Sequence, residues 1–264
     1  MPRIERPDGA ELHWEQRGEG PLVVIAQMGY APPSRLEPLI TDLAVDRRVV
    51  TYHPRGTGES SRTEPYEIET DAFDLAAVVE AAGPPAVVVA LADGCNRAVR
   101  AAAERPDLIT HVLAPGPPVF GRPPDPERSG DGLAASPPVL VAFLQLLETD
   151  YRAALNTMIK NGNPGIDEEG IRVRVDAIAG FSSHEATAAR MRAWIADDAW
   201  APAAALGERL WVLSHGRNPW FGDVGELARE LLPDAHIELI EDGPFDRPDL
   251  TAAAVRRLTA VQAG

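Results

Sequence analysis

The chain has 264 residues, 45% of them hydrophobic, which is enough for one α/β domain with an inserted segment. Its net charge of −15 disfavours nucleic acid and membrane surfaces as partners, because binding to either depends on clustered basic side chains. The sequence shows neither a signal peptide pattern nor 18 consecutive apolar residues, so we expect a cytoplasmic protein. Cys95 is the only cysteine, which excludes an internal disulfide.

Short apolar runs that alternate with helical patterns predict a mostly parallel, doubly wound sheet of about eight strands. Two extended segments around the turn Asp8-Gly9 predict an antiparallel hairpin at the start of this sheet. The further strands are expected at Leu22 to Gln27, Arg48 to His53, Ala86 to Ala92, His111 to Ala114, Leu210 to His215 and Ile237 to Glu241. Crossover helices are expected at Asp71 to Ala82, Asn96 to Arg105, Val224 to Leu232 and Leu250 to Val261.

A segment without strands interrupts this alternation. Residues 116–130 are rich in Pro and Gly, and the patterns that follow, up to about Leu206, are helical. They predict amphipathic helices at Pro137 to Thr149, Asp167 to Ala179 and Ser183 to Asp197. We therefore expect an inserted helical cap at residues 117–206, with residues 1–116 and 207–264 forming the core.

Motifs at three strand ends resemble those of the α/β-hydrolase superfamily. The loop Arg55-Gly56-Thr57-Gly58-Glu59-Ser60 matches the family's RGxGxS loop, and Met28-Gly29-Tyr30 occupies the place of its HG oxyanion loop. The segment Ala90 to Cys95 lies where the family has its nucleophile elbow. The resemblance covers nearly the whole chain apart from the cap, and it implies an α/β-hydrolase fold.

The same resemblance points to a degenerate catalytic triad. If Gly94 corresponds to the second glycine of the elbow, Ala92 stands in place of the nucleophilic serine. Asn218 then replaces the acid, and Pro244 replaces the histidine. Methyl, amide and pyrrolidine groups cannot attack a carbonyl, accept a proton from serine or orient a base. The substitutions therefore predict that serine acyl-enzyme chemistry has been lost.

Three other residues are candidates for catalysis: Asp93, His53 and Tyr30. Asp93 follows the elbow, where its carboxylate could act as an acid or base, or could simply favour the start of the helix. His53 ends a strand, where a structural role competes with a catalytic one. His13 lies on the second strand, and we expect it to be away from the carboxyl-terminal edge of the sheet.

The predicted site lies between core and cap and binds a largely apolar small organic molecule. Candidate binding residues are Gln27, Met28, Gly29, Tyr30, Ala92, Asp93, Asn218, Trp220, Phe221, Phe245 and His184. Ordinary packing competes with binding for the aromatic residues and for Gln27, and a helix start competes with binding for His184. No metal-ligand spacing occurs, and we expect no metal and no cofactor.

Three functions fit these features. The first is a non-hydrolytic enzyme, such as a cyclase, isomerase or lyase, that positions and polarises its substrate. The second is a ligand-binding or accessory protein without turnover. The third is an ester or related hydrolase with a nucleophile other than serine, such as Asp93.

Overall fold

The structure of the protein is a computed structural model that describes residues 2–116, 120, 138–163, 165–214 and 224–261. In these ranges eight strands form one sheet, in the order β1-β2-β4-β3-β5-β6-β7-β8. The strands are β1 (Arg3–Glu5), β2 (Glu11–Arg17), β3 (Leu22–Ala26), β4 (Arg48–Tyr52), β5 (Ala86–Ala90), β6 (Ile109–Pro115), β7 (Leu210–Ser214) and β8 (His236–Leu239). Only β1 with β2 and β2 with β4 pair in antiparallel fashion. The predicted mostly parallel, doubly wound sheet is confirmed.

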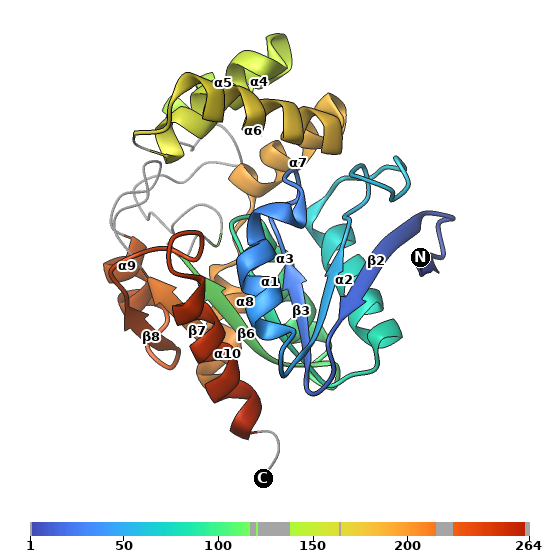
Figure 1. Ribbon diagram of the computed structural model, residues 1–264, viewed down its shortest axis with the longest axis vertical. Coiled ribbons are helices and arrows are strands. Elements are labelled where there is room, and N and C mark those ends of the chain that lie inside the picture. The colour runs from blue at the N-terminus through green and yellow to red at the C-terminus, as the bar shows by residue number, and fades with distance from the viewer. Residues whose placement is uncertain (1, 117–119, 121–137, 164, 215–223, 262–264) are drawn as a thin grey trace.

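Helices cover both faces of this sheet (Figure 1). On one face α1 (Glu37–Leu43) and α10 (Pro248–Val261) pack on alternate residues of the central strands, such as Val23, Ile25 and Val89. On the other face, the helices are α2 (Ile68–Ala82), α3 (Gly94–Glu104), α8 (Trp200–Ala205) and α9 (Val224–Leu231). Because both faces are covered, strands β3 and β5 are buried over their full length, which explains their continuous apolar sequences.

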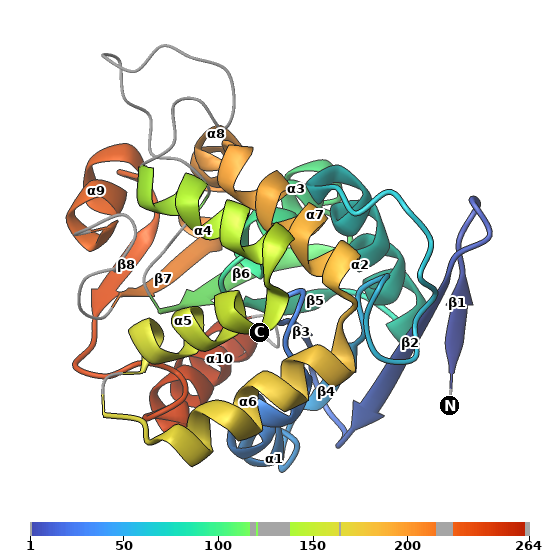
Figure 2. The ribbon, with the colours of Figure 1, turned by 90° about the horizontal axis from the view of Figure 1, so that it is seen from above.

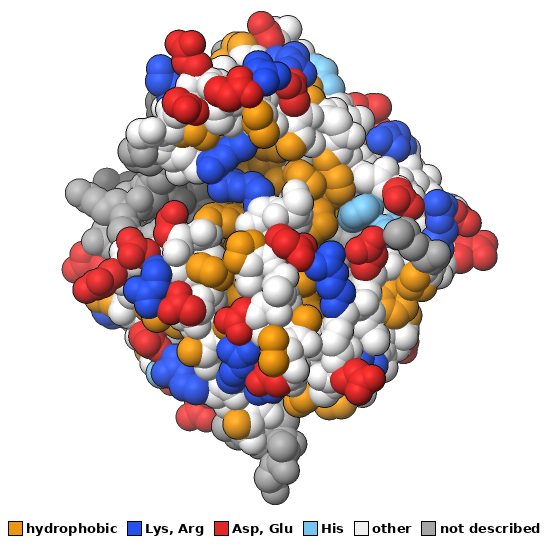
Figure 3. Space-filling model, in the orientation of Figure 1, with side chains coloured by type: hydrophobic (Ala, Val, Ile, Leu, Met, Phe, Trp, Pro, Cys, Tyr) orange, Lys and Arg blue, Asp and Glu red, His pale blue; other side chains and the backbone are white. Residues whose placement is uncertain are grey.

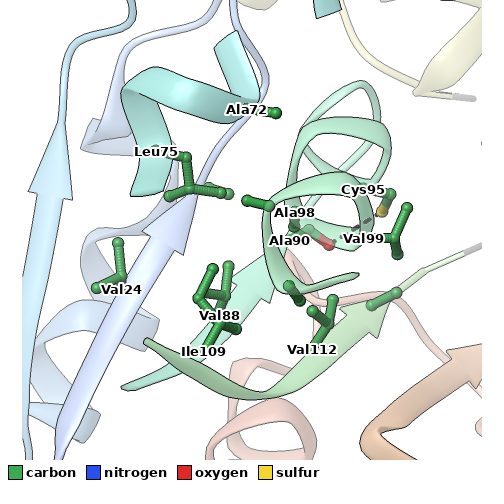
Figure 4. Packing of buried hydrophobic residues seen from close by; sticks show 14 of the residues in the cluster. Val24, Ala72, Leu75, Val88, Ala90, Cys95, Ala98, Val99, Ile109 and Val112 are labelled. Atoms are coloured by element: carbon green, nitrogen blue, oxygen red, sulfur yellow. Dashed lines mark hydrogen bonds between the residues drawn. The ribbon is translucent and has the colours of Figure 1, made fainter. Parts of the chain in front are cut away.

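The packing of α2 and α3 on the sheet fixes the end of β5 (Figure 4). Leu75 and Ala98 lie over Val88, and the buried Cys95 thiol donates to the Ala90 carbonyl at 3.3 Å. Burial raises the pKa of the Cys95 thiol to about 12. This thiol therefore stays protonated near neutral pH and belongs to the core.

The helices α4 (Pro138–Thr149), α5 (Tyr151–Gly162), α6 (Glu168–Phe181) and α7 (His184–Ala196) lie over the carboxyl ends of the parallel strands (Figures 1 and 2). Three of them begin at side-chain caps. Asp150 accepts the Ala153 N–H at 3.0 Å, Asp167 accepts that of Gly170 at 2.7 Å, and Ser183 accepts that of Ala186 at 3.1 Å. The helix start expected at Ser183 is observed.

The sequence patterns did not predict three of the helices, α1, α5 and α8, as separate elements. No helix was expected for α1 or α5, although the Asp150 cap and the spacing of Leu155 and Ile159 were signals for α5. The short α8 packs with α3 in the core cluster of the sheet, through Trp200 and Ala203. The limits of the cap at residues 117–206 stay a prediction.

The RGxGxS-like loop connects the cap to the sheet. Thr57 forms an isolated bridge with Ser182, and the Gly58 N–H donates to the Phe181 carbonyl at 2.7 Å. Arg55 of the same loop makes a bidentate ion pair with Asp74 on α2, with distances of 2.7 and 2.9 Å. The loop therefore joins α2 to the junction between α6 and α7.

Gly94 lets the start of α3 approach the end of β3. A Cβ atom at Gly94 would lie 2.1 Å from the backbone oxygen of Ala26. Gly180, within α6, has no heavy atom within 4 Å of the corresponding position. The close approach therefore requires glycine at position 94 but not at position 180.

We expect Gly94→Ala to lower the free energy of unfolding by about 3 kcal/mol, because β5, α3 and β3 must separate to admit the methyl group. Gly180→Ala is the matched control and should raise stability by about 0.5–1 kcal/mol, since alanine favours an exposed helix. Urea unfolding followed by circular dichroism measures both. A Gly94→Ala protein as stable as the wild type would contradict the close approach.

Candidate functional site

Ala92 lies at the apex of the tight turn between β5 and α3. Its φ of 50° makes it the one residue other than glycine with positive φ in the described part of the chain. An L-residue in this left-handed region costs about 1–2 kcal/mol, so the surrounding structure has to hold it there. Leu91 and Asp93 on either side are buried, whereas Ala92 is partly exposed. Ala92 therefore lies at the edge of the core.

Apolar side chains from the cap and from the loop after β3 surround Ala92. We call this group the Ala92 cluster; it contains Met28, Ala31, Leu155, Ile159, Ile171, Val175 and Ile178, with Tyr30, Ala92, Tyr151 and Met158 packed against it. Helices α5 and α6 thus supply most of the surface that faces the turn. Figure 3 shows hydrophobic and basic side chains gathered at the junction of cap and core. An environment of this kind suits an apolar ligand.

Asp93 points its carboxylate at the loop that follows β3. Both of its oxygens accept the Gly29 N–H at 3.0 Å, and Oδ2 also accepts from Arg97 Nη2 at 3.1 Å. Burial raises the pKa of the Asp93 carboxyl, although Arg97 and the Gly29 N–H oppose this effect. The structure therefore brings Asp93 and Gly29 together and makes their contact a link between the elbow and the oxyanion-type loop.

A chain of buried charges continues from Asp93 to the cap. Arg97 Nη1 lies 3.1 Å from Asp71 Oδ2, and Arg190 binds both Asp71 oxygens at 2.7 and 3.0 Å. Arg190 also donates to the backbone oxygens of Gly29 and Arg55, each at 3.0 Å. We call Asp93, Arg97, Asp71 and Arg190 the buried charge chain. It connects α3, α2 and α7 across the space beneath the cap.

Asp71, in the middle of the buried charge chain, is ionised because an arginine lies on either side of it. Burial acts to raise the pKa of Asp71, but the guanidiniums of Arg190 and Arg97 outweigh it and hold this pKa below its ordinary value.

The buried charge chain also explains the glycine at position 29. A Cβ atom at Gly29 would lie 2.3 Å from Arg190 Cδ and 2.7 Å from Asp93 Oδ2. Any larger residue there would displace the ion pairs.

Two backbone N–H groups beside Ala92 remain available. Neither the Tyr30 nor the Asp93 N–H has a hydrogen-bond acceptor in the described residues, whereas the Gly29 N–H is taken by Asp93. Among the described residues, the Tyr30 hydroxyl donates only to the Met28 sulfur, at 3.6 Å, which is a weak acceptor. Burial first, and the Asp93 charge second, raise the pKa of Tyr30, so its hydroxyl stays protonated. These donors can bind an oxygen atom of a ligand.

The structure places His53 in a different set of contacts. Its Nδ1 accepts the Glu59 N–H at 3.1 Å, and its ring lies edge-on to Phe181 with the centroids 5.0 Å apart. Burial, and then the neighbouring His13, lower the pKa of His53, so the ring is neutral at pH 7. Within the described ranges, none of its contacts joins it to Tyr30 or Asp93.

The expectation that His13 lies away from the carboxyl-terminal edge is wrong. Because β2 runs antiparallel to β4, Trp14 pairs with Tyr52, and the His53 N–H donates to the His13 carbonyl at 2.9 Å. The two imidazole centroids are 4.7 Å apart. The start of an antiparallel strand lies beside the end of its neighbour. The position of His13 therefore depends on the direction of β2 as well as on its place in the strand order.

The remaining candidates lie in four different situations. Gln27 is buried, and neither side-chain amide atom has a partner among the described residues. His184 is exposed and contacts the Leu147 carbonyl and the Tyr151 ring, so it joins α7 to α4 and α5. Pro244 is buried in the turn after β8, next to Phe245. The predicted residues Asn218, Trp220 and Phe221 lie outside the described residues.

Several residues of the site were not predicted. Arg97, Asp71 and Arg190 form the buried charge chain, although 119 positions separate Asp71 from Arg190. No local pattern pairs residues so far apart.

The described residues contain no group of three or more His, Cys, Asp or Glu side chains that could hold a metal ion. None of the described helices is long and apolar enough to cross a bilayer.

Solved structures with the same fold support this description. A bromoperoxidase from Bacillus anthracis is 22% identical, with a TM-score of 0.75 over 96% of this chain and 95% of that one. An α/β hydrolase from Sphaerobacter thermophilus is 26% identical, with a TM-score of 0.66 over 91% and 93%. The fold of this protein is therefore the α/β-hydrolase fold, as predicted.

Sequence comparison adds one weaker relative. An uncharacterized hydrolase of Bacillus subtilis (strain 168), YraK, is 29% identical over 118 residues. The match spans 42% of this chain and 42% of the length of that relative. No protein-family model matches the chain. The structural neighbours and this relative together support the α/β-hydrolase superfamily.

The buried charge chain predicts a sharp difference between two arginines of α7. Arg190→Gln leaves Asp71 without its bidentate partner and should lower the free energy of unfolding by about 3–5 kcal/mol. Arg192 of the same helix is exposed and pairs with Glu148, so Arg192→Gln should change stability by less than about 1 kcal/mol. Urea unfolding of both variants at pH 7 is the measurement. Equal effects would show that the buried ion pairs do not anchor α7.

Proposed function

We propose that the protein is a small-molecule enzyme that does not use serine acyl-enzyme chemistry, and that it acts at the Ala92 cluster between core and cap. The reaction class we propose is a rearrangement within one substrate, namely cyclisation, isomerisation or elimination. Binding beside the elbow would position an apolar substrate, and nearby hydrogen-bond donors would polarise its carbonyl oxygen.

The observation that carries this proposal is the methyl group of Ala92 at the apex of the turn. The positive φ of Ala92 and the contact of Gly94 with the Ala26 oxygen are the features expected of a nucleophile elbow. They support the alignment in which Ala92 occupies the nucleophile position. A methyl group cannot form an acyl intermediate, and Pro244 offers no base.

The polar groups near Ala92 suit polarisation of a substrate. The free N–H groups of Tyr30 and Asp93 are of the type that stabilises a developing oxyanion. The Tyr30 hydroxyl is a further donor and our candidate general acid. We assign Asp93 a positioning role, because its carboxylate already accepts from Gly29 and Arg97. His53 has no contact that supports a catalytic role.

A fluorophosphonate probe and p-nitrophenyl butyrate test the loss of serine chemistry. We expect no labelling and no ester release by the wild type above a heat-denatured sample. Ala92→Ser should also stay unlabelled, because a serine without a base is not activated. Mass spectrometry of the probe adduct and absorbance at the nitrophenolate band measure the two readouts.

Three results of these two assays would contradict the expected loss of serine chemistry or change its interpretation. Labelling of the wild type in stoichiometric amount would overturn the proposal. Ester release by the wild type that disappears in Asp93→Asn would favour a hydrolase with an aspartate nucleophile instead. Strong labelling of Ala92→Ser would mean that a base is present and that only the serine is missing.

Turnover distinguishes an enzyme from a binding protein. A ligand that co-purifies with the protein can be identified by mass spectrometry and incubated with fresh protein. We expect conversion to a product of the same formula, or of that formula less one small eliminated molecule. Recovery of the ligand unchanged, with full occupancy of the site, would favour an accessory binding protein.

A further inference from the structure

Two arginines near the Ala92 cluster have no acidic partner. Arg35 lies in the short helix η1 (Pro33–Leu36), directly after the loop that carries Tyr30 and Ala31, and Arg174 lies on α6. Both side chains are half-buried. Neither has a carboxylate within the 4.0 Å of an ion pair in the described part of the chain. The protein carries 40 acidic residues against 25 basic ones, so unpaired arginines stand out.

Several other arginines of the protein are paired with acidic side chains. Arg55, Arg97 and Arg190 are buried, and each binds one or more aspartates. Arg172, two residues before Arg174, is exposed and pairs with Glu169 and Asp176. Arg48 and Arg209 are also half-buried without a carboxylate in the described residues, but their guanidiniums donate to two and three backbone oxygens, respectively. What distinguishes Arg35 and Arg174 is that, in the described part of the chain, their guanidiniums donate to no backbone oxygen either.

The contacts of the two arginines hold them in place without neutralising them. The Arg35 guanidinium lies over the Phe245 ring, 4.2 Å from its centroid. Arg174 donates to Asn163 Oδ1 at the end of α5. Asp246 is within electrostatic range of Arg35 but forms no ion pair with it. Burial first, and repulsion from Arg174 second, lower the pKa of Arg35.

The arginine pair adjoins the elbow. The Tyr30 hydroxyl lies within electrostatic range of both Asp93 and Arg35. Tyr30 and Ala31 pack with Val175 and Ile178, which lie on the same helix as Arg174. An apolar surface and two positive charges are therefore continuous across η1 and α6. Basic side chains lie beside hydrophobic ones at the junction of core and cap in Figure 3.

We propose that the ligand of the Ala92 cluster carries a carboxylate, and that the guanidiniums of Arg35 and Arg174 bind this group while the apolar part contacts the cluster. A carboxylate between the two guanidiniums would relieve their repulsion and form charge-assisted hydrogen bonds. One arginine comes from the core and the other from the cap, so the ligand would join the two. This inference deepens the proposed function and rests on the site assigned there.

The test uses the neutral dye N-phenyl-1-naphthylamine as a fluorescent reporter of the apolar site. Octanoate and octanamide, which differ mainly in charge, serve as competitors. We expect octanoate to displace the dye from the wild type at a concentration about tenfold lower than octanamide does. Arg35→Gln and Arg174→Gln should each raise the octanoate requirement about tenfold and leave that of octanamide unchanged.

Arg172→Gln is the matched control, since it removes the same charge from the same helix at an exposed, paired position. It should behave as the wild type with both competitors. Equal competition by octanoate and octanamide in the wild type, or equal effects of Arg172→Gln and Arg174→Gln, would overturn the assignment. Circular dichroism confirms that each variant is folded, and Arg35→Lys should restore part of the octanoate preference if Arg35→Gln is unstable.

Ala92→Phe separates this inference from the proposed function. The larger side chain should fill the site and abolish dye binding. If the dye binds the wild type and not Ala92→Phe, but octanoate has no advantage, only the carboxylate inference fails. If the dye does not bind the wild type, or binds Ala92→Phe equally well, the site itself is wrong and both proposals fail.

Discussion

The arrangement of core and cap depends on the buried charge chain. Removing one charge from water costs several kcal/mol, and only a partner with good geometry offsets that cost. Asp93, Arg97, Asp71 and Arg190 are all fully buried, and they comprise two acidic and two basic side chains. None of them can be buried alone at neutral pH. The sheet, α2, α3 and α7 must therefore come together in one arrangement, in which Arg190 also binds the backbone oxygens of Gly29 and Arg55.

This constraint also shapes the surroundings of Ala92. Because Asp93 accepts the Gly29 N–H, the elbow and the loop after β3 are held at a fixed separation without any ligand. The same contact occupies the Gly29 N–H, whereas the Tyr30 and Asp93 N–H groups have no acceptor among the described residues. Donors that are already oriented need little reorganisation when charge develops on a substrate. The buried ion pairs would thus support the proposed polarising site by fixing its backbone, while the arginines and aspartates offset one another's charges.

The sequence predicted the features that depend on local patterns. Continuous apolar strands such as Val87 to Val89 and the Asp8-Gly9 turn predicted the sheet, and the spacing around Gly94 predicted a sharp turn between β5 and α3. The buried charge chain could not be predicted, because Asp71 and Arg190 meet only when α7 packs over α2. His13 was misplaced since the direction of β2 was not considered. Ion pairs between distant helices follow from tertiary packing, which no local pattern contains.

The proposed arginine pair has to act against the field of the whole molecule. With a net charge of −15, the protein repels an anionic ligand at long range, and dissolved salt screens this repulsion over about 10 Å at 0.1 M. Arg35 and Arg174 are half-buried beside apolar side chains, where screening is weaker. Added salt would therefore weaken the long-range repulsion more than the short-range attraction. An exposed basic patch would lose affinity for a carboxylate as the salt concentration rises. For two arginines enclosed between core and cap, we expect carboxylate binding to persist as the salt concentration rises.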